Sequence, residues 1–135
     1  MNRRQFNQRF AAVAGSAALS SLPLMARAQA WPSRPISLVI PYPPGGNTDF
    51  MGRATAEWLT KALDNPVVPD NRAGAGGTIA ADYAARAQPD GHTLFFATIT
   101  QISLARFLYK VRYDPFKDFV PIANVGGNPL VLTVR

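Results

Sequence analysis

Residues 36–49, I-S-L-V-I-P-Y-P-P-G-G-N-T-D, decide how this chain folds. A short apolar run ends at three prolines, which lack the N–H group that a strand ladder needs, and a Gly-Gly pair follows. A long segment with helical spacing of its apolar residues then begins. This order predicts a buried strand, a tight loop and a helix.

The loop between this strand and this helix has the chemistry of a small-anion site. Gly45 and Gly46 allow a positive φ and let a ligand approach the backbone closely. Asn47 or Thr48 can cap the helix, whose first N–H groups form a positive end that suits a small anion. The loop matches neither G-x-x-x-x-G-K-[ST] nor G-x-G-x-x-G, so nucleotide phosphate is not the expected ligand. Asp49, in the first helical turn, is interpreted as a capping carboxylate more than as a ligand contact.

Residues 1–30 have the features of a secretory signal peptide. Three arginines in residues 1–9 precede an Ala-rich, weakly apolar stretch, and residues 28–30 form the small-x-small pattern of a cleavage site. Cleavage after Ala30 would leave an exported, periplasmic chain with no stable membrane insertion. The run R-R-Q-F within residues 1–9 also fits the twin-arginine export pattern, and an ordinary Sec signal is the alternative.

The composition excludes several classes of function. The 135-residue chain has a net charge of +6, but four of its 14 basic residues and none of its 8 acidic residues lie in residues 1–30. The remainder therefore carries only +2, and no basic cluster alternates with aromatic residues as a nucleic-acid groove requires. There is no cysteine and only one histidine, so no metal site and no cofactor is expected. Residues 31–135 suffice for one domain.

The mature segment alternates apolar and amphipathic stretches in the order β-α-β-α-β-α-β-β. Helices of this length between apolar strands favour an α/β fold with a mostly parallel sheet flanked by helices. Trp58 is expected in the core, and the third strand is expected to be buried on both faces. The predicted helices are residues 48–63, 78–88 and 101–109, and the predicted strands are residues 36–41, about 67–68, 93–98, 119–125 and 130–134.

The loops that follow these strands are predicted to lie together. Right-handed crossovers place them along one edge of the sheet, where open α/β sheets bind ligands. The loops at residues 41–48 and 98–101 are therefore predicted to face one crevice. The glycine-rich turn at residues 74–78 follows the second strand and is placed near the same rim.

No catalytic set is visible in the sequence. Ser103 falls on a predicted helix, and G-x-S-x-G does not occur. His92 has no histidine or carboxylate cluster around it and is interpreted as a rim residue that enters the third strand.

Five motifs in fixed order resemble the Bug family, the extracytoplasmic solute receptors of tripartite tricarboxylate transporters. Together they span the chain from Trp31 to the region of residue 122, and the resemblance covers essentially the whole mature segment. The motifs are W-P-S-R-P-I at 31–36, V-I-P-Y-P-P-G-G-N-T-D at 39–49, N-R-A-G-A-G-G-T-I-A-A-D at 71–82, P-D-G-H-T-L at 89–94 and Y-D-P-F-K-D-F-V-P-I at 113–122.

This resemblance implies a periplasmic binding protein of type II, in which two α/β lobes close on a small carboxylate. Residues 31–135 resemble the first lobe, cut at the hinge that leads to the second. The chain departs from the family's usual small or polar residues and Asn-Pro after the third strand, since Ile99, Ala105 and Arg106 stand there. The residues that the resemblance and the loop chemistry assign to the ligand are Tyr42, Pro44, Gly45, Gly46, Asn47, Thr48, Asp49, Thr98, Thr100 and Gln101.

Two functions follow as hypotheses. In the first, the protein captures a small carboxylate in the periplasm and delivers it to membrane transporter subunits or to a sensor. In the second, it is a small exported α/β enzyme, a hydrolase or phosphoryl-handling protein that uses the Gly-Gly loop as an anion hole. The missing catalytic set favours the first, and the sequence does not name the ligand.

Overall fold

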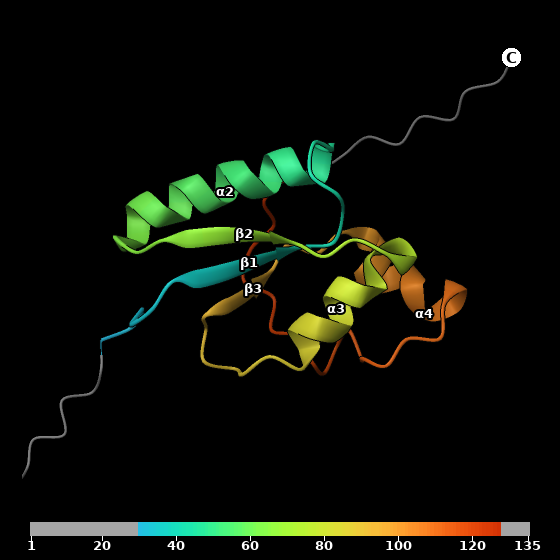
Figure 1. The fold of residues 1–135 in the computed structure, drawn as a ribbon. Coiled ribbons are helices and arrows are strands. Elements are labelled where there is room, and N and C mark those ends of the chain that lie inside the picture. The colour runs from blue at the N-terminus through green and yellow to red at the C-terminus, as the bar shows by residue number, and fades with distance from the viewer. Residues whose placement is uncertain (1–29, 128–135) are drawn as a thin grey trace, which may run out of the picture. The chain divides into compact units, whose positions relative to one another are not determined.

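The structure, a computed structural model, describes residues 30–127 (Figure 1). The predicted signal peptide at residues 1–30, apart from its last residue, and the predicted strand at residues 130–134 lie outside these residues. Among the described residues, none of the helices has both the length and the apolar character needed to cross a bilayer.

A parallel three-stranded sheet forms the centre of the fold. Strand β1 (Ile36–Ile40) lies between β2 (Val67–Asn71) and β3 (Thr93–Phe95). In register, Leu38 of β1 is paired with Pro69 on one side and with Leu94 on the other. The predicted parallel sheet is therefore confirmed. The prediction that the third strand is buried on both faces is wrong, because the three residues of β3 are half-buried at the edge of the described sheet.

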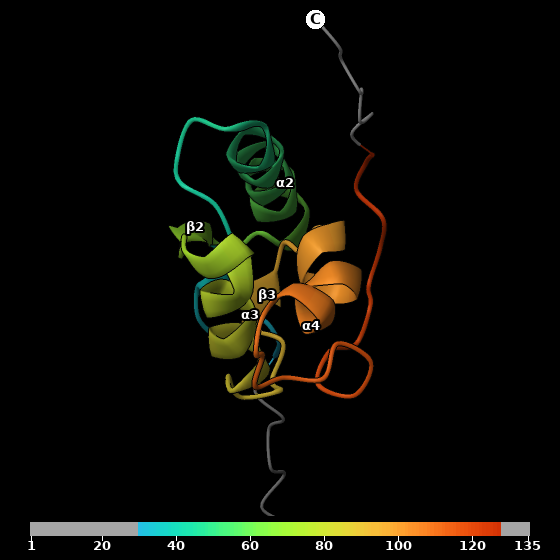
Figure 2. The ribbon, with the colours of Figure 1, turned by 90° about the vertical axis from the view of Figure 1, so that its right-hand side faces the viewer.

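Helices cover the two faces of this sheet. Helix α2 (Asn47–Leu63) lies over one face, whereas α3 (Thr78–Ala85) and α4 (Ala105–Leu108) lie on the other side (Figures 1 and 2). Two apolar clusters match these layers. The first is built on Ile36, Leu38, Ala56 and Val67, with Leu59, Leu63, Leu94 and Phe96 packed against it. The second is built on Ala81, Ala105 and Tyr113, with Ala85, Phe95, Val111 and Phe119.

The buried face of α2 differs from the predicted one. Its buried residues are Asp49, Gly52 and Ala56, and the side chain of Trp58 is 67% exposed. A Cβ on Gly52 would lie 2.7 Å from Cδ1 of Ile40, so the helix approaches the sheet closely along its small residues. The prediction that Trp58 lies in the core is therefore wrong, because the close contact selects small side chains over the largest one.

The segment after β3 is helical as predicted, but it is less regular than an α-helix. A π-helical turn (Thr100–Leu104) leads directly into α4. The predicted turn that follows is present, since the N–H of Asp118 donates to the carbonyl of Asp114 at 2.9 Å.

The strand predicted at residues 119–125 does not form. Phe119 packs against Phe95, with ring centroids 5.5 Å apart, and most of the residues that follow it are exposed. A strand needs a neighbouring backbone to complete its ladder, and within residues 30–127 the sheet contains only three strands.

Two of the sequence motifs meet at the amino-terminal edge of the sheet. The N–H of Ser33 donates to Nε2 of His92 at 3.2 Å, and Arg34 pairs with Asp90 at 2.8 Å. The ring of Trp31 stands edge-on to the His92 ring, with centroids 6.0 Å apart. His92 therefore enters the third strand as predicted, but it is a buried residue, 5% exposed, that holds the start of the mature segment.

Candidate ligand-binding site

The loops that follow the three strands gather at the carboxyl edge of the sheet, which faces the viewer in Figure 2. The loop after β1 leads into α2. A 3-10 turn (Ala75–Gly77) follows β2 and leads into α3, and the loop after β3 leads into the π-helical turn. Hydrogen bonds between these loops, described below, confirm the prediction that the glycine-rich turn reaches the same rim.

The loop after β1 borders an open depression of about 390 Å³. Five of the predicted ligand residues line it, and Pro43 completes the lining. Gly45 has a φ of +91°, and a Cβ built on it would meet no heavy atom within 4 Å. The five predicted residues are Tyr42, Pro44, Gly46, Asn47 and Thr48.

The start of α2 corrects two expectations. Gly46 has a φ of −85°, so only Gly45 of the pair needs the left-handed region. Gly46 is also the N-cap residue, and Asn47 and Thr48 are the first helical residues instead of caps. Because a glycine cap has no side chain, it offers no side-chain acceptor to the N–H groups of the first turn. The depression therefore lies at a positively polarised helix end.

Asp49 is buried, 4% exposed, and its carboxylate is held by three donors. Oδ2 accepts from the N–H of Gly45 and from Nε of Arg53, both at 2.9 Å, and Oδ1 accepts from Nδ2 of Asn71 at 2.8 Å. The Arg53 guanidinium first, and then the Gly45 and Asn71 donors, hold the pKa of Asp49 well below its usual range. The carboxylate thus ties the glycine loop to the helix.

Asn71 is a site residue that the sequence interpretation missed. Its amide nitrogen donates both to Asp49 and, at 2.9 Å, to the carbonyl of Tyr42, and its oxygen accepts from Arg53 at 3.0 Å. It is the last residue of β2 and the first of the motif N-R-A-G. An asparagine at the carboxyl end of a strand beside the predicted crevice was the available signal.

The loop after β3 is linked to both other loops through Gln101. The N–H and the hydroxyl of Thr98 each donate to Oε1 of Gln101 at 2.9 Å. Nε2 of Gln101 donates to the carbonyl of Gly76 at 2.7 Å and to the hydroxyl of Tyr42 at 3.3 Å. The side chain is thereby fully used inside the protein, so it supports the loops and has no hydrogen-bonding capacity left for a ligand.

The hydroxyl of Tyr42 lies where these loops meet. Burial would raise its pKa, but hydrogen bonds with Thr100, Thr98 and Gln101 outweigh burial and lower it. Thr98 and Thr100 are both half-buried next to this hydroxyl. Of the three residues where the chain departs from the family, Ile99 and Arg106 are exposed and Ala105 is buried in the second apolar cluster.

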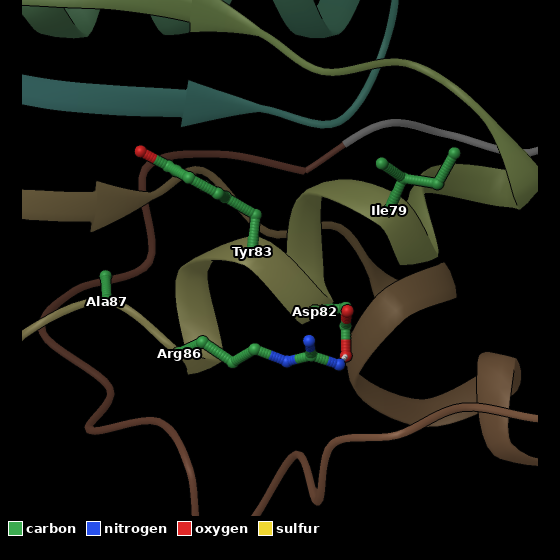
Figure 3. Close-up of a pocket in the computed structure, with 5 residues that line it drawn as sticks. All are labelled: Ile79, Asp82, Tyr83, Arg86 and Ala87. Atoms are coloured by element: carbon green, nitrogen blue, oxygen red, sulfur yellow. Dashed lines mark hydrogen bonds and ion pairs between the residues drawn. The ribbon is translucent and has the colours of Figure 1, made fainter.

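A second depression, of about 320 Å³, lies on α3 and shares no residue with the predicted site (Figure 3). Ile79 and Tyr83 extend to one side of the helix, whereas Asp82 and Arg86 form an ion pair of 2.7 Å (Figure 3). The guanidinium of Arg72 lies 3.5 Å over the Tyr83 ring. Within residues 30–127, no group of three or more histidine or acidic side chains is arranged to hold a metal ion.

Comparisons with known proteins give one consistent result. The family described as tripartite tricarboxylate transporter family receptor matches residues 51–135. Protein BugT of Bordetella pertussis is 41% identical over 129 residues, which cover 93% of this chain and 37% of BugT.

Two solved structures are similar in both sequence and fold. One is a periplasmic transporter, with 41% identity and a TM-score of 0.60 over 65% of this chain and 30% of that one. The other is MatC from Rhodopseudomonas palustris with bound malate, with 40% identity and a TM-score of 0.65 over 67% of this chain and 31% of MatC. The chain spans about a third of the length of these relatives.

Proposed function

Since the chain belongs to the tripartite tricarboxylate transporter receptor family, we propose that it acts in the periplasm as part of a receptor for a small carboxylate. The receptor delivers this ligand to transporter subunits in the membrane or to a sensor. Residues 1–30 serve as an export signal that is cleaved after Ala30, and residues 31–135 are the first of two lobes. These assignments rest on the family and on the sequence motifs of the chain. The relatives are about three times as long, so the chain corresponds to only a part of them.

The observation that carries the proposal is the depression at the start of α2. Gly46, Asn47 and Thr48 line it at the start of the helix. Main-chain N–H groups and a threonine hydroxyl are neutral donors of the kind that replace the water shell of a carboxylate. Asp49 does not oppose an anion there, because its charge is buried and compensated by Arg53. The malate bound to MatC supports a dicarboxylate as the class of ligand.

Binding without chemical turnover is part of this proposal. Ser103 lies on the π-helical turn, and the sole histidine is engaged at the opposite edge of the sheet. No contact among residues 30–127 therefore supports a side-chain nucleophile with an adjacent base, the pair that covalent hydrolysis requires. The enzyme hypothesis has no observation in its favour.

Titration of the protein with L-malate, followed by amide NMR shifts, tests the proposal at weak affinities. We expect the amide resonances of residues 45–49 and of Thr98 to shift with a common dissociation constant. Dimethyl malate, which is neutral, should leave these chemical shifts unchanged. Thr48→Val should weaken binding, and Thr55→Val is its matched control because the Thr55 hydroxyl bonds to the Met51 carbonyl within α2. Absence of any shift up to about 10 mM malate, or equal shifts with the ester, would contradict carboxylate binding at this loop.

A further inference from the structure

We propose that Gln101 is the positioning residue of this site: it touches no ligand, but it sets the mutual placement of the three loops that surround one. The inference deepens the proposed function and rests on it. It starts from an uncommon feature, a glutamine side chain only 1% exposed at the edge of the sheet where the loops are otherwise open.

Each polar position of the Gln101 amide has a partner, and the partners come from different loops. Thr98 lies three residues before it, Gly76 lies 25 residues before it and Tyr42 lies 59 residues before it. One side chain therefore connects the loops that follow β1, β2 and β3. A fully satisfied buried network of this kind is rigid, and it becomes costly when one member is lost.

Steric contact reinforces these hydrogen bonds. Gly77 has a φ of +86°, and a Cβ on it would collide with the Gln101 amide and lie 2.8 Å from Cβ of Pro41. The glycine-rich turn is thus pressed against both the Gln101 side chain and the end of β1. The Gln101 amide lies between the turn and the Tyr42 hydroxyl and hydrogen-bonds to both.

The backbone of Gln101 is anchored from the opposite side. Its carbonyl accepts from the hydroxyl of Tyr113 at 2.8 Å, and Tyr113 belongs to the second apolar cluster. Gln101 lies near the start of the π-helical turn, a distortion that often occurs at functional sites. The core therefore holds the main chain of Gln101, while its side chain holds the loops.

Substitution of Gln101 by methionine separates this role from general folding. Gln101→Met keeps the side-chain length and leaves the Gly76 carbonyl and the Thr98 N–H without their partner. The matched control is Gln88→Met, because Gln88 is exposed. Thr98→Val removes the hydroxyl contacts to Gln101 and to Tyr42, and it serves as a milder second variant if Gln101→Met does not fold by circular dichroism.

Two measurements on the full chain decide the matter. The first is the pKa of Tyr42, followed by NMR of ring-labelled tyrosine and assigned with Tyr42→Phe. Gln101→Met should raise it, because a donor to the hydroxyl is lost, and Gln88→Met should not. The second is the dissociation constant for L-malate, which should weaken by about tenfold or more.

A folded Gln101→Met variant with an unchanged Tyr42 pKa, or with an unchanged malate affinity, overturns the proposal. A weaker affinity with an unchanged Tyr42 pKa would mean direct ligand contact and also overturns it. If the wild-type protein does not bind malate, the proposed function fails separately, and the Tyr42 titration alone decides whether Gln101 positions the loop.

Discussion

At both edges of the sheet, buried polar side chains connect segments that are distant in sequence. The two edges differ because only the carboxyl edge, of the two described here, borders a depression. At the carboxyl edge, Asp49, Asn71 and Gln101 tie loops that are distant in sequence, beside a depression of about 390 Å³. At the amino edge, His92 and Asp90 bind Ser33 and Arg34 of the segment that begins at Trp31. The Trp31 ring lies against Gly91.

The difference between the edges lies in the backbone that each network presents. The carboxyl edge contains a glycine loop with open space at Gly45 and the positively polarised start of a 17-residue helix. At the amino edge the strands begin, and the backbone donors there are used: Ser33 donates to His92, and Ser37 donates to the His92 carbonyl. Polar networks order both edges, and the one at the carboxyl edge lies beside the depression at the start of α2.

The largest effect is expected from glycine substitutions at the carboxyl edge. Gly77→Val should lower the free energy of unfolding by more than about 3 kcal/mol, because it adds strain at a positive φ to a collision with Gln101 and Pro41. Gly45→Ala should cost about 1 kcal/mol, since its φ is positive but its surroundings are open. Gly46→Ala should stay within about 0.5 kcal/mol. Urea unfolding measures all three, and equal losses at the three positions would show that the loops are not tightly placed.

Removal of the Asp49 charge is the next largest test of the carboxyl edge. Asp49→Asn removes the carboxylate that pairs with Arg53 and disturbs the bonds to Gly45 and Asn71, so the Tm should fall by several degrees. Glu57→Gln is the matched control, because Glu57 pairs with Lys61 at the same helical spacing on the exposed side of α2. Equal changes in Tm for the two variants would contradict a structural role for the buried carboxylate.

A smaller effect is expected at the amino edge from His92. His92→Leu removes the acceptor of the Ser33 N–H, at a cost of about 1 kcal/mol, and should free Trp31. In a Trp58→Phe background, the Trp31 fluorescence should therefore shift to longer wavelength, while malate shifts at residues 45–49 stay unchanged. His92→Gln keeps an acceptor and should retain more of the contact. A loss of malate binding in His92→Leu would show that the two edges are coupled.

The response to acid compares the two edges directly. The Asp49 pKa is held well below its usual range, and the His92 N–H and then Arg34 lower the pKa of Asp90 to about 2. Unfolded aspartate has a pKa of about 3.9, so the unfolded chain binds these protons first as the pH falls. Both carboxylates should stabilise the fold above about pH 4 and lose this contribution toward pH 2 and below. Melting curves of Asp49→Asn and Asp90→Asn should be less acid-sensitive than the wild type. The Asp49 variant should differ more, because Asp90 is more exposed.

The amino-acid sequence by itself determined the local features of this protein. The proline stop after β1, the glycine loop, helix α2 and the parallel order of the strands follow from dihedral preferences and from apolar periodicity over a few residues. The placement at one edge of the loops that follow the strands is also determined, because the handedness of crossovers is a general rule.

The tertiary structure alone decided which side chains are buried and what they bind. The exposure of Trp58, the use of Gly46 as the N-cap and the absence of a strand at residues 119–125 depend on which surfaces are available to pack or pair. Asn71 and Gln101 acquire their roles through partners 22 to 59 residues away. The residues next to a polar side chain in the sequence do not predict such distant partners. Its burial and its hydrogen bonds depend on the groups that surround it in the folded structure.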